Sequence, residues 1–592
     1  GILRVIGLYA IRLIFRLGGS LNWYIKNRRL NQMLRQKVED IKKHHFKFDT
    51  SDVKDIDSII KMDVTQLRSG LIEGRFTSLQ LVNVFGERCQ RIGKKLCLNS
   101  EVYYEQAIQM AKLRDAETEE ARKLGADAMS KLPPMHGVPF SVKDSINLKG
   151  VLSTVGCSYL LDDPAKENAV IVDQYIRAGG IPLVKGNIPQ TALGTDTNNF
   201  IYGHSKNPLD VTRSCGGSSG GNAGQIVSRC VPIGIGTDVG GSLRFPAAFC
   251  GIYGFKPTQE RGSKRGATTC TKNRFSSWMH LRSCSGPMGT SVDDLVVGMR
   301  IQASADVHRL DPFAAPTPFR ETDYAKAVEP SSFKGRKIGM LRMETNLKLT
   351  KSVQRAMDVA GEALKKLGFQ VVEFAITREE VQTVKDCFYA MVANGMISGT
   401  AREAIKQGES LLGPQANNIR LMTGGKVDRI LVDFVMRHLH NNKRGNDNIR
   451  NLRKMSEEEF EDVLKERYEF CHRFAQKWRD SGIEALISPI WPSCANKLET
   501  AAKLGLMLDY ALIWNMTGFP AGAIPVTQVK ESDLGDNYED GFEDLWTDCL
   551  RENVKGSLNL PIGLQVIGYS YEDEQTLGVM KVLDGYLKSN PQ

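Results

Sequence analysis

The sequence lacks several patterns that would assign a function directly. Its twelve cysteines include no C-x-x-C pair, which argues against a zinc ribbon, a thiol redox motif and a disulfide scaffold. The G-x-x-x-x-G-K-[ST] loop that cradles phosphate in nucleotide-binding proteins is missing too. Internal repeats and low-complexity tracts are absent, and 41% hydrophobic with 25% charged residues is the composition of a folded globular protein. A reducing compartment suits the main body of the chain.

A long uncharged apolar run is also missing from the N-terminus. The first residues, GILRVIGLYAIRLIFRLGGSL, are apolar, but Arg4, Arg12 and Arg16 interrupt them. The stretch therefore falls short of the roughly 18 uncharged residues expected of a bilayer span. The three arginines fall on one side of a helical projection, which favours an amphipathic helix in a membrane interface, although a helix docked on the protein's own core has the same pattern. We expect residues 1–30 to form a membrane-associated helix.

The formal net charge of +10 is concentrated at this same end. Residues 1–45 hold ten Lys and Arg residues against only Glu39 and Asp40, so the rest of the chain is close to neutral. Basic residues that follow Trp23 and Tyr24 are typical of a helix at the level of lipid headgroups. No nucleic-acid-binding motif accompanies them, so we expect a membrane surface and no nucleic acid as a partner.

Helical and strand patterns succeed one another along the remaining chain. Residues 51–130 show apolar residues at helical spacing, and Pro133 and Pro134 end this part. Strands alternating with helices then predict an α/β layer structure. The segment 401–454 differs, because basic residues interrupt its apolar runs; it predicts amphipathic helices on a membrane surface or a solvated helical hairpin. The expected strands are HGVPFSVKD, GGIPLVKGN, CVPIGIGTDVGGS, CGIYGFKPT, KIGML, FQVVEF, ALISPIWP, GAIPVTQV and PIGLQVIG.

Glycines gather between Gly203 and Gly254, around two turns that carry serine. Ser218 and Ser219 lie in GGSSGG, and Ser242 lies further on in TDVGGSLRFP. Glycine lets backbone N–H groups in such turns point into one space, as an oxyanion hole requires. The candidate donors are the backbone amides of Val239, Gly240, Gly241 and Ser242.

A nucleophilic serine needs a base that removes its proton. His136 and His204 are the histidines nearest the glycine-rich region, but neither lies in a recognisable serine-protease context. Lys143 ends the apolar strand VPFSVKD, and burial there would lower the pKa of a lysine and keep it neutral. A solvated lysine at the end of a strand is the competing interpretation.

Three segments, in order and spacing, resemble the amidase signature family: GVPFSVKDSI, GGSSGG and GTDVGGSLRFPAAFCGIYGFKPT. The resemblance extends over most of residues 60–320 and returns in DYALIWNMTGFPAGAIPVTQV and NLPIGLQVIG. It implies an α/β fold with a central mixed, twisted β-sheet covered by helices on both faces. Residues 31–592 would form this catalytic domain.

The resemblance also implies roles for individual residues. Ser242 would be the nucleophile, Lys143 the base, and Ser218 the hydroxyl that relays the proton between them. The peptide bond between Gly217 and Ser218 is cis in this family. Ser219 and Arg244 would support the site. No metal or organic cofactor is needed for the implied reaction, which is hydrolysis of a carboxylic amide through an acyl-enzyme.

Within the family, the enzymes that cleave fatty acid amides are the most similar. The shared features are the basic apolar N-terminus, the insert near 401–440 and the acidic stretch YEDGFEDLW. They imply N-acylethanolamine and primary fatty amide substrates, a membrane cap at about 401–440, a homodimer, and an intracellular membrane such as the endoplasmic reticulum with the catalytic domain in the cytosol. A small-molecule amidase and the glutaminase subunit of a tRNA-dependent amidotransferase share the signature. A catalytically silent membrane-associated scaffold is the non-enzyme alternative.

Overall fold

The computed structural model describes residues 2–267, 281–395, 403–413, 437, 441–442, 444–445, 450–534 and 538–591, and of residues 2–21 the backbone only. Within these residues, eleven strands form one sheet in the order β1-β3-β2-β8-β10-β9-β14-β15-β13-β11-β12. The strands are β1 (Asn99–Val102), β2 (Pro139–Lys143), β3 (Ile181–Gly186), β8 (Ile233–Asp238), β9 (Tyr253–Lys256), β10 (Cys284–Gly289), β11 (Lys337–Met343), β12 (Gln370–Ile376), β13 (Ile483–Pro489), β14 (Ala521–Gln528) and β15 (Pro561–Gly568). Two small ribbons pair β4 (Asn198–Asn199) with β5 (Gly203–His204) and β6 (Lys206–Asn207) with β7 (Asp210–Ser214).

The sheet is mixed, as predicted. β2 lies parallel to β3 and β8, and β11 lies parallel to β12 and β13, whereas the other neighbouring pairs are antiparallel. Every predicted strand is present. The pattern missed β1 and β10, because their sequences, NSEV and CSGPMG, hold few β-branched or aromatic residues and long-range pairing with β3, β8 and β9 places them in the sheet.

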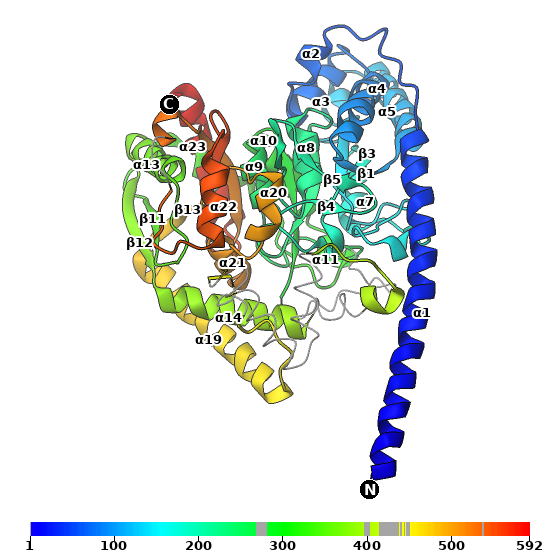
Figure 1. Ribbon diagram of the computed structural model, residues 1–592. Coiled ribbons are helices and arrows are strands. Elements are labelled where there is room, and N and C mark those ends of the chain that lie inside the picture. The colour runs from blue at the N-terminus through cyan, green and yellow to red at the C-terminus, as the bar shows by residue number, and fades with distance from the viewer. Residues whose placement is uncertain are drawn as a thin grey trace.

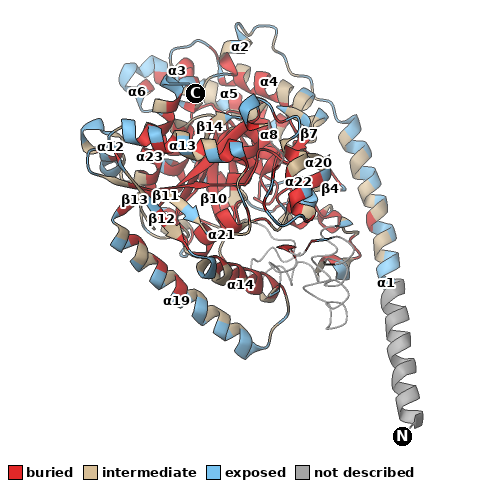
Figure 2. Cartoon of the chain, turned by 60° about the vertical axis from the view of Figure 1, so that its left-hand side comes forward, coloured by how far each residue is buried: buried red, intermediate tan, exposed pale blue. Residues whose placement is uncertain are grey.

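Helices cover both faces of the sheet. Side chains alternate between the faces of a strand, and on β13 Ala485 and Ile487 pack with α13 and α23 while Leu486 packs with α14, α19 and α21. Figure 2 shows the sheet buried between these helices. The helices are α1 (Ile2–Lys43), α2 (Ile56–Ile59), α3 (Val64–Ile72), α4 (Ser78–Arg88), α5 (Tyr104–Leu124), α6 (Ala126–Ser130), α7 (Val170–Arg177), α8 (Gly220–Val227), α9 (Arg244–Cys250), α10 (Val292–Gln302), α11 (Val307–Leu310), α12 (Glu321–Val328), α13 (Lys351–Lys366), α14 (Arg378–Asn394), α19 (Glu457–Ser481), α20 (Leu498–Ala501), α21 (Asp509–Met516), α22 (Leu545–Val554) and α23 (Asp573–Ser589).

The N-terminal helix α1 runs beside the body and extends beyond it (Figure 1). The helix predicted over 1–30 continues to Lys43, because the following residues, NQMLRQKVEDIKK, are mostly strong helix formers. Its second half is docked: Leu30 is buried in a small apolar cluster with Tyr159, and Lys37 forms an ion pair with Glu101 at 2.7 Å. No helix in the described ranges is both long and apolar enough to cross a bilayer.

The predicted cap segment, 401–440, lies mostly outside the described residues. Its described stretch, 403–413, is tied to the body at a buried carboxylate, since Glu409 accepts the backbone N–H of Ser158 at 2.9 Å. The side-chain amide of Gln190 donates to the Ser410 carbonyl at 2.7 Å and accepts the Leu412 N–H at 2.9 Å. These bonds hold 403–413 against Ser158 and the short 3-10 helix Gln190–Ala192.

Candidate active site

The predicted base and both serine turns meet at one edge of the sheet. β2 ends at Lys143 and its parallel neighbour β8 ends at Asp238, so both residues emerge on the same side. Ser218 and Ser219 directly precede α8, and Ser242 lies just before α9. The Ser219 N–H donates to the Ser242 carbonyl at 3.2 Å, so the two turns are in direct contact.

The side chain of Lys143 is completely buried. Its Nζ bonds to Ser218 Oγ at 2.7 Å, to Thr237 Oγ1 at 2.8 Å and to the Thr237 carbonyl at 3.3 Å. Burial lowers the pKa of Lys143 to about 7, against the charges of Asp238 and Asp144, which raise it. A large share of the molecules therefore holds a neutral amine near pH 7, and a neutral amine can accept a proton.

The turn that carries Ser218 is packed too tightly for side chains. The Gly217–Ser218 peptide bond is cis, as the resemblance implied. A Cβ on Gly217 would lie 2.6 Å from the Gly194 carbonyl oxygen, and Gly216 has a φ of 78°, which favours glycine. The glycines therefore allow the Ser218 hydroxyl to reach Lys143 from a turn pressed against neighbouring backbone.

Asp238 holds the turn that carries Ser242. Its carboxylate accepts the N–H groups of Gly241 at 2.8 Å and Leu243 at 3.1 Å, and Arg244 Nε donates to it at 3.0 Å. Burial alone would raise the pKa of Asp238, but the Arg244 guanidinium and the Asn515 amide bring it well below its ordinary value. Asp238 is thus a buried carboxylate that anchors the turn, and Arg244 supports the turn by balancing the negative charge of Asp238.

One of the four amides predicted as oxyanion donors is already engaged. The N–H of Gly241 points to Asp238, so the prediction for this residue is corrected: Gly241 shapes the turn. Its φ of 111°, and a Phe245 ring atom 2.3 Å from where a Cβ would lie, admit only glycine there. Val239, Gly240 and Ser242 remain as candidate donors, and all three line one cavity.

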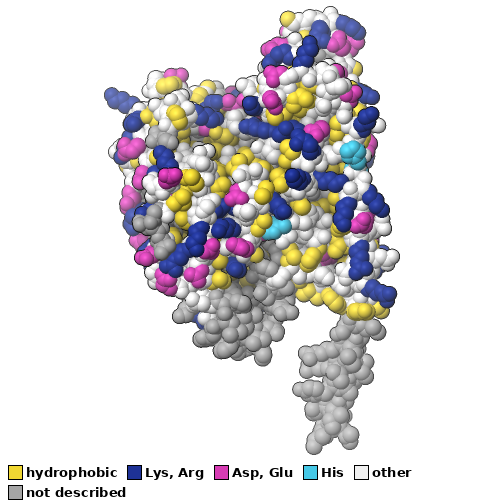
Figure 3. All heavy atoms as spheres, turned by 45° about the horizontal axis from the view of Figure 1, so that its top comes forward, with side chains coloured by type: hydrophobic (Ala, Val, Ile, Leu, Met, Phe, Trp, Pro, Cys, Tyr) yellow, Lys and Arg dark blue, Asp and Glu magenta, His cyan; other side chains and the backbone are white. Residues whose placement is uncertain are grey.

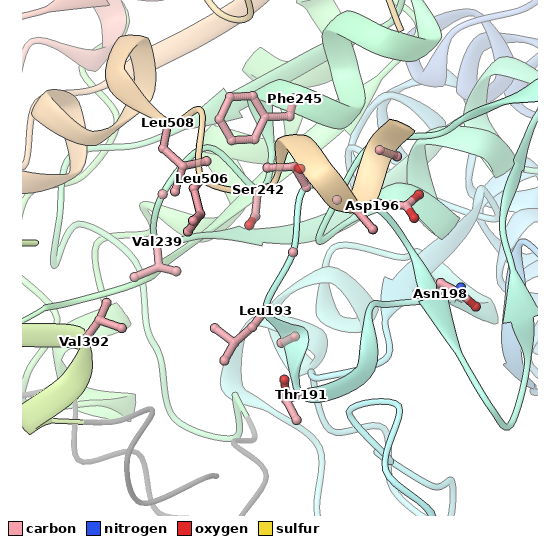
Figure 4. A pocket seen from close by; sticks show the side chains of 18 of the residues that line it. Thr191, Leu193, Asp196, Asn198, Val239, Ser242, Phe245, Val392, Leu506 and Leu508 are labelled. Atoms are coloured by element: carbon pink, nitrogen blue, oxygen red, sulfur yellow. The ribbon is translucent and has the colours of Figure 1, made fainter. Parts of the chain in front are cut away.

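This cavity has a volume of about 240 Å³ and reaches Ser242, which is only partly buried (Figure 4). In Figure 4, Val239, Val392, Leu506 and Leu508 lie on one side of Ser242, and Asp196 and Asn198 lie on the other. The apolar part of the lining also includes Leu193, Phe245, Leu281, Phe388, Leu412 and Leu452.

Neither histidine considered as a base lines this cavity. His136 is buried 2.8 Å from Thr118 Oγ1, and burial lowers its pKa. His204 lies on β5 beside Asp196. Within the described ranges, no group of three or more His, Cys, Asp and Glu side chains is arranged to hold a metal ion.

Sequence reasoning missed Thr237, Asp238 and Asn515. The first two had a local signal, because polar residues that end a buried strand ahead of a glycine turn are placed to serve a site. Asn515 had none: it donates to Asp238 at 2.8 Å from a helix 277 positions further along the chain.

Comparison with known proteins identifies the family of the chain. A family model described as Amidase matches residues 80–577. The chain belongs to the amidase signature family. Fatty-acid amide hydrolase 1 of Sus scrofa is 30% identical to this amidase over 457 residues, which are 76% of this chain and 75% of the relative. A glutamyl-tRNA(Gln) amidotransferase subunit of Fusobacterium nucleatum is 26% identical over 551 residues, 89% of this chain and 97% of the relative. A solved structure of a fatty acid amide hydrolase has the same fold, with a TM-score of 0.75, 19% identity and 96% coverage of both chains.

Proposed function

We propose that this amidase hydrolyses fatty acid amides, both N-acylethanolamines and primary fatty amides, to a free fatty acid and an amine. The observation that carries the proposal is the apolar side of the cavity next to Ser242, built by Val239, Val392, Leu506 and Leu508. Such a surface suits an acyl chain better than the polar side chain of glutamine. The similarity to fatty-acid amide hydrolase 1 supports the same substrate class.

In the proposed reaction, neutral Lys143 takes a proton from Ser218 while Ser218 takes the proton of Ser242. The Ser242 oxygen attacks the amide carbonyl carbon, and the amides of Val239, Gly240 and Ser242 stabilise the oxyanion. The relay then returns the proton to the amine nitrogen, the C–N bond breaks, and an ester remains on Ser242. Water, deprotonated through the same relay, attacks this ester and releases the fatty acid.

We further propose that residues 1–30 and the 401–440 segment contact an intracellular membrane, such as the endoplasmic reticulum, and that two subunits associate with their catalytic domains in the cytosol. Trp23, Tyr24 and Ile25 support the membrane contact, because all three are exposed on α1. On the face of the body seen in Figure 3, acidic and basic side chains are interspersed.

The test compares hydrolysis of a long-chain N-acylethanolamine, a short-chain amide and glutamine by the detergent-solubilised protein. We expect preference for the long chain and its loss in Ser242→Ala. Ser228→Ala is the matched control, because this serine directly follows α8 and its hydroxyl bonds only nearby backbone and Cys230. Preference for the short amide or for glutamine would replace the lipid assignment, and no turnover by a folded protein would favour the scaffold.

A further inference from the structure

Polar side chains line the cavity on the side of Ser242 opposite the apolar wall, which is formed by Val239, Val392, Leu506 and Leu508. Thr195, Asp196 and Asn198 contribute to the lining there. Figure 4 shows Asp196 and Asn198 across Ser242 from Val239. An acyl chain would gain nothing from a carboxylate and an amide, so these residues indicate contact with another part of a substrate.

Asp196 is held in place from behind. Its side chain is 9% exposed, His204 Nε2 lies 2.9 Å from each of its carboxylate oxygens, and the Ser214 hydroxyl donates to Oδ1 at 2.6 Å. The ribbon β4–β5 sets this position, because Asn198 and His204 face each other across it. A carboxylate offers about four acceptor positions, so two protein partners leave room for a donor from a ligand.

Thr195 gives an independent indication of a ligand. The residue is 4% exposed and lines the cavity, yet its Oγ1 has no hydrogen-bond partner among the described residues. Buried hydroxyls almost always have a partner, because an unpaired one is costly. A polar group of a bound substrate beside Asp196 would supply it.

The position of these residues relative to Ser218 tells which part of the substrate they meet. A Cβ on Gly217 would lie 2.8 Å from the Asp196 backbone nitrogen, and Thr197 Oγ1 donates to the Gly216 carbonyl at 2.8 Å. The segment 195–198 thus packs against Gly216 and Gly217, which directly precede Ser218. Ser218 is the group proposed to protonate the departing nitrogen. The segment 195–198 lies on the amine side of the scissile bond, with the apolar wall on the acyl side.

We propose that Thr195, Asp196 and Asn198 form a subsite for the amine part of the substrate. The subsite selects amides whose amine carries a second hydrogen-bond donor, a hydroxyl or an ammonium group, on a short chain. An amine with a purely apolar tail would bury the Asp196 carboxylate without offering this carboxylate a hydrogen-bond donor. An amine with an anionic tail would be repelled by the negative charge of Asp196. This inference rests on the proposed reaction at Ser242.

The test uses three amides that share one long acyl chain: the N-propyl, the N-(2-hydroxyethyl) and the N-(2-aminoethyl) amide. We expect wild type to favour at least one donor-bearing amide over the N-propyl amide by about tenfold or more in kcat/KM. The hydroxyethyl and aminoethyl substrates tell a hydroxyl from an ammonium ligand. Asp196→Asn should lower the ratio, because a neutral amide oxygen is a weaker acceptor than a carboxylate, whereas Ser228→Ala should keep the wild-type ratio.

A wild-type ratio near one, or an unchanged ratio in Asp196→Asn, would overturn the subsite. If Asp196→Asn is inactive towards all three amides, Asn198→Leu decides through a second readout. Ethanolamine, ethylenediamine and propylamine are added to the acyl-enzyme, and the new amides are measured against the free acid. The subsite is supported if the wild-type acyl-enzyme reacts preferentially with a donor-bearing amine and this preference is lost in Asn198→Leu. Equal reaction with all three amines overturns it. Hydrolysis that survives Ser242→Ala would instead overturn the proposed reaction.

Discussion

The buried amine of Lys143 predicts how activity depends on pH. Below its pKa of about 7 the amine is protonated and cannot accept the proton of Ser218. Activity should therefore fall as the pH falls. The neutral fraction is about nine-tenths at pH 8, about half at pH 7 and about one-tenth at pH 6. For an amide that does not itself titrate, kcat/KM should follow these fractions, because it reports the free enzyme.

Two variants sharpen this prediction. The charge of Asp144 raises the pKa of Lys143, so Asp144→Asn should shift the midpoint of the profile to lower pH. Lys143→Arg places a permanent cation at the base position and should abolish hydrolysis at every pH. The assay is initial-rate hydrolysis in buffers of constant ionic strength. A flat profile between pH 6 and 8, or a midpoint near the ordinary lysine value of 10.5, would refute the assignment of Lys143 as a neutral base.

Three substitutions test the surroundings of the site. Asp238→Ala leaves the buried Arg244 without its counter-charge, so the free energy of unfolding in urea should fall by about 3–5 kcal/mol; a loss near zero would contradict the anchoring role. Leu506→Trp reduces the space on the apolar wall, so the preferred acyl chain should become shorter, with about tenfold lower kcat/KM for the longest chain; an unchanged chain-length profile would place the chain elsewhere. Gln190→Ala removes the side-chain oxygen that accepts the backbone N–H of Leu412, a residue that lines the cavity. We therefore expect a few-fold higher KM with little change in kcat. An unchanged KM would show that this hydrogen bond does not shape the cavity.

The local sequence pattern indicated where the candidate catalytic residues lie. The strand that ends at Lys143 is apolar except for Ser141 and is buried on both faces, so the strand and its end could be found without tertiary information. The glycines around Ser218 and Ser242 are likewise a signal in the local sequence, because tight turns require glycine. The resemblance then joined these segments, and the structure brings the Lys143 amine and the Ser218 hydroxyl within 2.7 Å of each other.

Features made by distant segments escaped prediction. β10 belongs to the sheet because β8 and β9 flank it and not because of its own sequence. The cavity joins Val392 on α14 with Thr195 and Leu506, which are far apart along the chain. The engaged amide of Gly241 could not be foreseen either, because the sequence says which residues are glycine and not where their N–H groups point.

The proposed reaction requires that Ser242 becomes acylated. The most direct measurement is mass spectrometry of the protein quenched with acid during turnover of a long-chain amide, followed by proteolysis to locate the adduct. We expect one fatty acyl group, with loss of the amine, on the peptide that contains Ser242, and no adduct in Ser242→Ala. An acyl group on Ser218 or Ser219, or sustained turnover by Ser242→Ala, would contradict it.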